Sequence, residues 1–190
     1  TGQRIVTYLK KELLEIGNGE LPKDVKLFAF DTASRTAHAG DEDGVFRLGD
    51  VSLEENTEYV CIGADLYDTV IEIKADQDRV ANGETPLKPH LHWFPAGEMQ
   101  NRGLPRSAFN TMLGAGAYRT LGRLSLFVNV PTVLAHLENA MTDLLGGVQG
   151  TRSAAGGGRT RLLEIIVVGS LAGGTGAGTF VDMAWLARAQ

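Results

Sequence analysis

The residues with the clearest chemical potential form a glycine-rich run near the end of the chain, GGTGAG at 173–178. It follows an apolar run at 162–168, which predicts a buried strand, and it precedes a helix expected to begin at about Thr179. The free N–H groups and the dipole of a helix N-terminus attract anions, and glycines let phosphate oxygens approach the backbone. Thr175 and Thr179 add hydroxyl donors, and Thr179 could also cap the helix. The run predicts a phosphate-binding loop; the simpler alternative is a tight turn without a ligand.

Two further expected helix starts carry glycine. LGAGA at 113–117 precedes a helix expected over 121–130, and Gly2-Gln3 stands at the start of a helix expected over 3–16. Taken alone, the first is as compatible with a turn as with a phosphate loop, and the second indicates nothing. Together, three glycine-bearing helix starts in one α/β chain suggest convergence on one polyanionic ligand. The phosphate chain of a nucleotide is the natural candidate.

The common nucleotide motifs fit this chain poorly. It has no Gly-x-x-x-x-Gly-Lys-Ser/Thr sequence, which excludes the common P-loop. The glycine pairs at 174–176 and 114–116 supply only the first two glycines of G-x-G-x-x-G, because Thr179 and Arg119 occupy the third position. An NAD-dependent oxidoreductase with a degenerate dinucleotide fingerprint therefore stays an alternative.

A family resemblance rests on these same loops. Residues 170–178, Ser-Leu-Ala-Gly-Gly-Thr-Gly-Ala-Gly, resemble the glycine-rich phosphate loop of the tubulin and FtsZ superfamily. The loop at 113–117, followed by Gly122-Arg123, resembles the γ-phosphate loop of FtsZ. Tyr118-Arg119-Thr120 replaces the family's Asn-Pro-Glu there, so that Arg119 could reach the phosphates directly.

Two earlier segments agree in order with the same superfamily. Gly2-Gln3 resembles the end of its first glycine loop, and Phe30-Asp31-Thr32 stands where its second loop lies near Mg²⁺ and the phosphates. The whole pattern resembles a bacterial tubulin-like protein more than ordinary tubulin or FtsZ. It implies an α/β fold of the tubulin/FtsZ GTPase-domain type, a Rossmann-like three-layer αβα arrangement with a mostly parallel sheet, incomplete at both ends. Residues 1–190 would form one partial nucleotide-binding domain, with an insertion at about 33–110.

The resemblance implies a GTP/GDP-binding module of a cytoskeletal GTPase, with Mg²⁺ bridging phosphate oxygens and Asp31 reaching the ion through water. No residue is expected to be a firm metal ligand. The implied nucleotide-binding residues are Gly2, Gln3, Asp31, Thr32, Gly114, Ala115, Gly116, Ala117, Arg119, Gly173, Gly174, Thr175, Gly176, Ala177, Gly178 and Thr179.

The parts that read the base and catalyse hydrolysis come later in family members, so hydrolysis is expected of the full-length parent and not of this chain alone. The parent would self-associate into filaments. A scaffold that binds nucleotide without turnover is the remaining alternative.

Composition narrows the classes of partner. The 190 residues carry 18 Lys and Arg against 23 Asp and Glu, a net charge of −5, which argues against broad binding to nucleic acid. The single cysteine, Cys61, cannot form an internal disulfide and favours a reducing compartment, the cytoplasm. The longest apolar run falls far short of the ~20 residues of a membrane span, so no membrane insertion is expected.

Hydrophobic periodicity and turn residues predict the remaining elements. They are a strand at 25–30, a loop or hairpin at 34–57, a strand at 59–62, a helix at 65–74, a loop-rich stretch at 85–106, a short helix at 108–113, a helix at 132–145 set off by Pro131, and a flexible loop at about 146–160.

Overall fold

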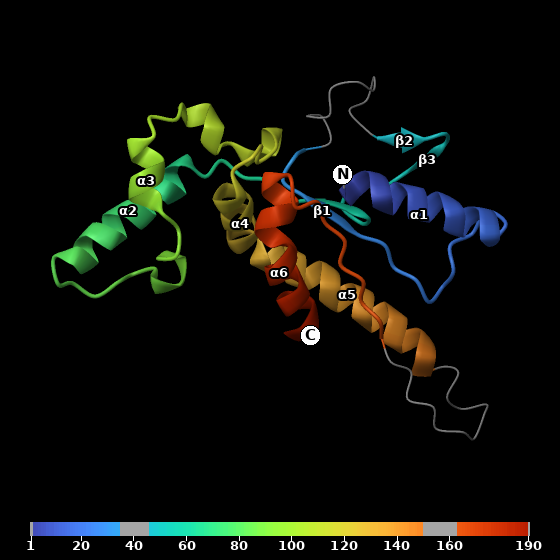
Figure 1. Cartoon of the computed structure of the whole chain (residues 1–190). Coiled ribbons are helices and arrows are strands. Elements are labelled where there is room, and N and C mark those ends of the chain that lie inside the picture. Colours follow the sequence, from blue (N-terminus) through green and yellow to red (C-terminus); the bar gives the residue numbers. More distant parts are fainter. Residues whose placement is uncertain (1, 35–45, 150–162, 190) are drawn as a thin grey trace.

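The computed structural model describes residues 2–34, 46–149 and 163–189, and shows a mixed α/β chain with a small parallel sheet (Figure 1). Its strands are β1 (Ala29–Asp31), β2 (Arg47–Leu48), β3 (Val51–Ser52) and β4 (Tyr59–Cys61). Its helices are α1 (Gly2–Ile16), α2 (Tyr67–Ala81), α3 (Ala96–Asn101), α4 (Arg119–Val128), α5 (Val130–Gln149) and α6 (Gly174–Ala189), with 3₁₀ turns η2 (Pro89–Leu91), η3 (Arg106–Phe109) and η4 (Thr111–Leu113). The α/β class is confirmed, and the full three-layer arrangement stays a prediction.

The parallel sheet consists of β1 and β4, with Phe30 opposite Val60. The strand expected at 59–62 is confirmed as β4, whereas the strand expected at 25–30 begins only at Ala29. Ala29 lies opposite Tyr59, the first residue of β4, and a strand exists only where a neighbour completes its hydrogen bonds. Within the stretch expected to be a loop or hairpin, β2 and β3 form an antiparallel hairpin; the acidic residues 41–43 lie outside the described residues.

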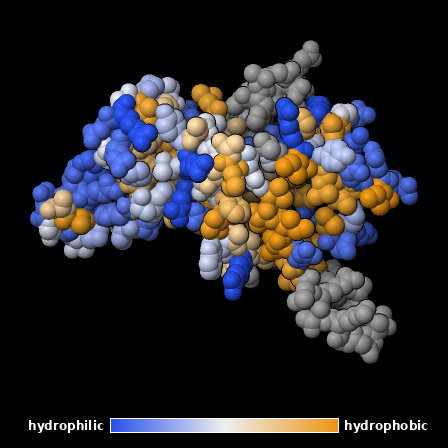
Figure 2. Space-filling model, viewed as in Figure 1, coloured by the Kyte–Doolittle hydropathy of each residue, from blue (hydrophilic) through white to orange (hydrophobic). Residues whose placement is uncertain are grey.

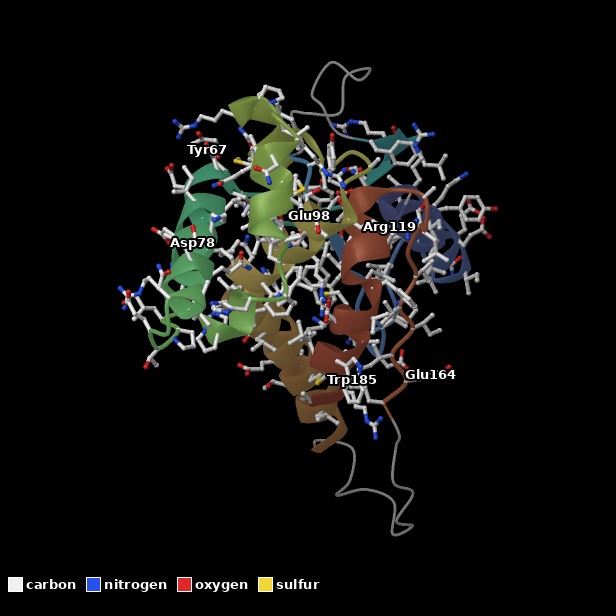
Figure 3. The ribbon with its side chains drawn as sticks, turned by 60° about the vertical axis from the view of Figure 1, so that its left-hand side comes forward. Tyr67, Asp78, Glu98, Arg119, Glu164 and Trp185 are labelled. Carbon is white, nitrogen blue, oxygen red and sulfur yellow. The ribbon has the colours of Figure 1, made fainter. Side chains whose placement is uncertain are left out.

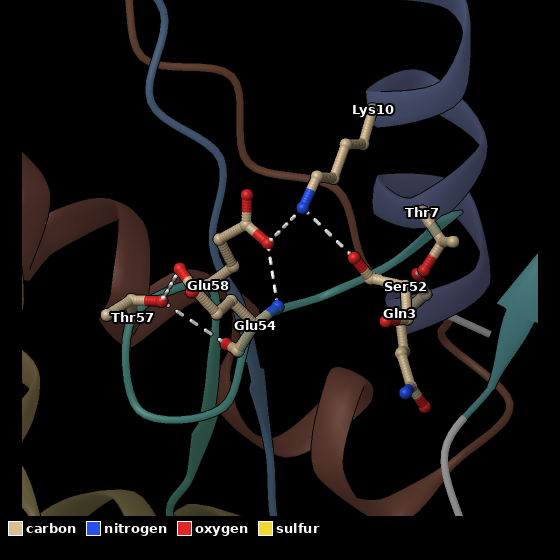
Figure 4. Close-up of polar contacts among 7 residues, drawn as sticks. All are labelled: Gln3, Thr7, Lys10, Ser52, Glu54, Thr57 and Glu58. Atoms are coloured by element: carbon tan, nitrogen blue, oxygen red, sulfur yellow. Dashed lines mark hydrogen bonds and ion pairs between the residues drawn. The ribbon is translucent and has the colours of Figure 1, made fainter. Parts of the chain in front are cut away.

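Helix α1 packs its polar side on the hairpin and on the turn before β4. The Thr7 hydroxyl donates to the Gln3 carbonyl at 3.0 Å, and both residues are buried. Lys10 Nζ lies 2.6 Å from the Glu58 carboxylate and 3.0 Å from the Ser52 carbonyl oxygen (Figure 4). The two lysine contacts tie the helix to both the hairpin and the turn before β4.

The predicted break at Pro131 is confirmed, because α4 ends at Val128 and α5 begins at Val130. Proline is tolerated in the first turn of a helix, where its missing N–H would be unpaired anyway. Between the helices, the Asn129 side-chain amide donates to the Ile62 carbonyl at 3.1 Å and anchors the break to the end of β4. A core joins β4 to α4, α5 and α6; its buried members are Val60, Ile62, Leu126, Val133, Leu137, Met183 and Ala187.

Helix α5 runs further than expected. It continues to Gln149, so the first residues of the flexible loop expected at about 146–160 are helical. Residues 150–160 lie outside the described residues.

A second core joins α2, α3 and α4. It buries Leu66, Val70, Ile73, Leu91, Phe94, Ala96, Met99, Phe109, Leu121 and Leu124. The helix expected at 65–74 is longer, and the stretch expected to be loop-rich contains η2 and α3. The short helix expected at 108–113 is instead two 3₁₀ turns, because Asn110 between them has an extended backbone. The segment expected to be an insertion therefore holds most of this core, and it also holds β4, which pairs with β1.

Buried Asp76 fastens the proline-containing loop to α2. Its carboxylate accepts the backbone N–H groups of Leu87 and Lys88 at 2.8 Å each and lies 2.8 Å from His92 Nε2. These hydrogen bonds, first of all the one from Leu87, lower the pKa of Asp76 to about 2.

Two expectations near the end of the chain are wrong. The strand expected at 162–168 is not formed over the described residues 163–168, and apolar side chains such as Ile166 (77% exposed) stay open to solvent. No described strand lies beside this segment to complete its hydrogen bonds. Helix α6 begins at Gly174 instead of Thr179, so Thr179 is no cap and its hydroxyl donates to the Thr175 carbonyl at 2.8 Å. The glycines form the first turn because the helix is packed there by its neighbour α4.

Within the described part of the chain, no helix has both the length and the apolar character needed to cross a membrane.

Candidate functional site

The starts of α4 and α6 meet at backbone level because both contain glycine. The Gly174 N–H donates to the Gly116 carbonyl at 2.6 Å. A Cβ at Gly122 would collide with the Gly174 carbonyl, and one at Gly178 would collide with the Arg119 carbonyl. Gly178, predicted to bind phosphate, therefore serves the packing of the two helices.

The loop before α4 also depends on glycine. Gly114 and Gly116 have φ angles of +101° and +55°, a region that side-chain-bearing residues rarely adopt. The loop ends at Tyr118, which precedes α4 and provides no side-chain cap. Among the described residues, no N-cap side chain binds the N–H groups of the first turn of α4.

Free N–H groups also mark the start of α6. The Ala177 N–H donates to the Gly173 carbonyl at 3.1 Å, which places Gly173 at the N-cap position. In the described part of the chain, the N–H groups of Thr175 and Gly176 make no hydrogen bond. Two uncapped helix starts side by side are an arrangement that suits an anion, because donors and dipoles converge there.

Thr32 connects the end of β1 to both glycine loops. Its side chain is fully buried, with 0% exposure. The Ala115 N–H donates to Thr32 Oγ1 at 3.1 Å, and Thr32 Oγ1 lies 2.6 Å from Thr175 Oγ1. The Thr32 hydroxyl therefore links three segments that are far apart in the sequence.

A cavity of about 690 Å³ opens beside these loops, between α1, β1, residues 163–170, α5 and α6. Most of the predicted site residues line it: Gly2, Gln3, Asp31, Gly114, Ala115, Gly116, Gly173, Gly174, Thr175, Gly176 and Thr179. Five predicted residues do not line it: Thr32, Ala117, Arg119, Ala177 and Gly178. The glycine loops form one end of the cavity. Its remaining lining is mostly apolar and includes Lys26 and Glu164. Figure 2 shows a hydrophobic surface over α6 and the segment that leads into it.

The charged candidates lie at the edges of this site. Arg119 projects near the start of α6 and its guanidinium donates to the Leu171 carbonyl at 3.4 Å (Figure 3). Asp31 lines the cavity, and one of its carboxylate oxygens accepts the Ala33 N–H at 3.3 Å. Within residues 2–34, 46–149 and 163–189, no group of three or more His, Cys, Asp or Glu side chains could hold a metal ion.

Sequence reasoning missed the ion pair that holds α4 against α6. Because α6 begins at Gly174, Asp182 lies beyond the first turn of this helix. The Arg123 guanidinium donates to both Asp182 oxygens at 2.7 and 3.0 Å, and these bonds raise the pKa of Arg123. Arg123 also lies 4.5 Å over the Trp93 ring and 5.3 Å from the Phe127 ring. Only the Gly122-Arg123 match to the family loop marked this position.

The chain is a mixed α/β domain in which two glycine-bearing helix starts meet at one end of a cavity. A scan against protein-family models matches the family described as "Tubulin like" over residues 1–190. The chain belongs to this tubulin-like family. No curated protein and no solved structure matched it.

Proposed function

We propose that this chain is the GTP-binding module of a tubulin/FtsZ-like cytoskeletal GTPase, with the nucleotide phosphates held at the adjoining starts of α4 and α6. The observation that carries the proposal is the cavity end where the 113–117 loop and the 170–176 loop meet. Membership of the tubulin-like family supports a guanine nucleotide over a dinucleotide.

Backbone N–H groups, a hydroxyl and a carboxylate would each contribute to binding of the phosphates and Mg²⁺. The free N–H groups of Thr175 and Gly176 would donate to phosphate oxygens, and the Thr175 hydroxyl would add a side-chain donor. Mg²⁺ is a hard cation that prefers oxygen ligands, phosphates and water, so the Asp31 carboxylate at the cavity wall fits a water-mediated contact. When bound, the ion would neutralise charge on the phosphates. Hydrolysis would require catalytic residues beyond this chain.

The three-layer sheet is part of the same proposal. Among the described residues, β1 pairs only with β4 and residues 163–168 pair with no strand, and both segments line the cavity. Gly2, the first residue of α1, lies close to the Val168 carbonyl at the end of the cavity that the glycine loops form. A strand leading into α1 would fill the cavity and make α1 the crossover of a parallel βαβ unit. Backbone hydrogen exchange in the intact protein tests this: the amides of 165–168 should be protected, and exchange at unprotected rates would refute it.

The binding test is a titration of the intact protein with fluorescent mant-GTP, with and without Mg²⁺, against NADH. We expect Mg²⁺-dependent saturation by mant-GTP and no saturation by NADH; the reverse result would favour an oxidoreductase. Light scattering after addition of GTP separates a filament-forming GTPase, which scatters, from a scaffold that binds nucleotide and stays dispersed.

A further inference from the structure

We propose that Thr32 is a positioning residue that sets the Thr175 hydroxyl as a hydrogen-bond donor into the phosphate site. The inference rests on the proposed nucleotide binding and adds a role for a buried side chain that touches no ligand. Its starting point is the chain of three polar groups from Ala115 through Thr32 to Thr175.

The direction of this chain follows from its first member and from the burial of Thr32. A backbone N–H can only donate, so Thr32 Oγ1 accepts from Ala115 at 3.1 Å. Thr32 is fully buried, and among the described residues Thr175 Oγ1, 2.6 Å away, is the one group that can accept its hydroxyl hydrogen; a buried donor needs such an acceptor. Thr175 Oγ1 thus accepts from Thr32, and its own hydrogen stays available for another acceptor.

The position of Thr175 at the cavity determines where its hydroxyl hydrogen can point. Thr175 lines the cavity, whereas Thr32 is fully buried beneath it. An anionic oxygen in the cavity would therefore receive a hydrogen bond from a hydroxyl that is already polarised by two donors behind it. Hydrogen bonds in such a chain strengthen one another, and bonds to charged acceptors are the strong ones.

The same contact couples the two glycine loops. Ala115 belongs to the loop before α4, and Thr175 lies in the first turn of α6. Thr32 therefore binds both loops with one hydroxyl group. Loss of its hydroxyl would leave the Ala115 N–H without its acceptor and would free the Thr175 hydroxyl to turn away from the site.

The test is a double-mutant cycle in the intact protein, with affinities for GMP, GDP and GTP measured by competition against mant-GTP. Thr175→Val removes the donor and should weaken binding roughly tenfold, the scale of a hydrogen bond to a charged group. Thr32→Val is nearly isosteric and should weaken binding roughly three- to tenfold, through the same bond. The double variant should lose no more than Thr175→Val alone, because both changes act on one hydrogen bond.

Conservative variants separate positioning from simple stabilisation. Thr32→Ser and Thr175→Ser keep the hydroxyls and should restore affinity even if they lower the melting temperature. Losses from Thr32→Val and Thr175→Val that add in full would overturn the coupling, as would unchanged affinity in Thr32→Val. If the unaltered protein binds no nucleotide, the proposed function itself fails; if it binds and Thr32→Val changes nothing, only this inference fails.

Discussion

Gly173 offers the sharpest probe of the phosphate site, because nothing lies within 4 Å of the place where its Cβ would stand. By contrast, a side chain at Gly174 would meet three carbonyl oxygens at 2.9 Å, and one at Gly176 would meet the Ser170 carbonyl at 2.5 Å. Loss of binding in those two variants would not distinguish damaged packing from a blocked site. Substitution of Gly173 can alter the start of α6 without breaking the fold.

Gly173→Asp should affect folding and binding in opposite directions. At an N-cap position, Asp and Asn accept hydrogen bonds from the first free N–H groups and are favoured over Gly by a few tenths of a kcal/mol. Ala is less favourable than Asp or Asn there by about 1 kcal/mol. The same N–H groups, of Thr175 and Gly176, are the proposed phosphate donors. An Asp side chain would occupy them and also repel the phosphate.

The charge term can be isolated with a matched pair. At roughly 5 Å, one like charge costs about 1 kcal/mol in a water-like medium and about 3 kcal/mol at an effective dielectric constant near 20. Gly173→Asp should therefore bind GTP roughly 5- to 150-fold more weakly than the isosteric Gly173→Asn. Affinity should fall in the order Gly, Ala, Asn, Asp, whereas stability should be lowest for Ala.

Two measurements check this prediction: mant-GTP titration for affinity, and thermal unfolding without ligand for stability. The difference between the Asp and Asn variants should shrink as salt is added, because the site is open to solvent. Equal GTP affinity for these two variants would refute the placement of phosphate at the start of α6.

Three further predictions concern contacts that hold the fold together. Gly122→Ala places a methyl group against the Gly174 carbonyl and should destabilise the protein by about 1–3 kcal/mol, measured by urea unfolding, and weaken nucleotide binding. Gly103→Ala, at an exposed turn with a φ angle of +62° outside the helix pair, should lower stability and leave nucleotide affinity unchanged. Arg123→Lys cannot reproduce the two-pronged bond to Asp182 and should cost about 1 kcal/mol in thermal unfolding; full stability with Lys would show that charge alone suffices. The pKa of Asp76 is lowered from 3.8 to about 2, so its stabilisation is fully present above pH 3.8 and is lost as pH falls toward 2. Asp76→Asn should flatten stability over this window, and a titration of unfolding free energy that matches the unaltered protein would contradict the role of Asp76.

Local patterns in the sequence predicted much of the helical frame. Periodic apolar residues placed α1 and α4, and Pro131 marked the break between α4 and α5, because proline lacks an N–H and restricts the residue before it. Clustered glycines marked both loops of the candidate site. These features depend on neighbours within a few residues, so a single chain read in order reveals them.

Other features depend on segments that are distant in the sequence. The run at 162–168 has the composition of a buried strand, yet the described part forms none, because a strand needs a partner beside it. The start of α6 shifted to Gly174 because α4 packs against its glycines, which no local propensity for helix indicates.

The sequence by itself determined that this chain has glycine-bearing helix starts of the kind that bind phosphate. Only the tertiary structure decided which glycines face the cavity and which pack helices: Gly173 lies open, while Gly178 meets α4. It also decided that buried Thr32 joins the two loops through Ala115 and Thr175. The physical reason is that a hydrogen bond or a backbone contact is set by position in space, and residues 32, 115 and 175 become neighbours only when β1, α4 and α6 pack together.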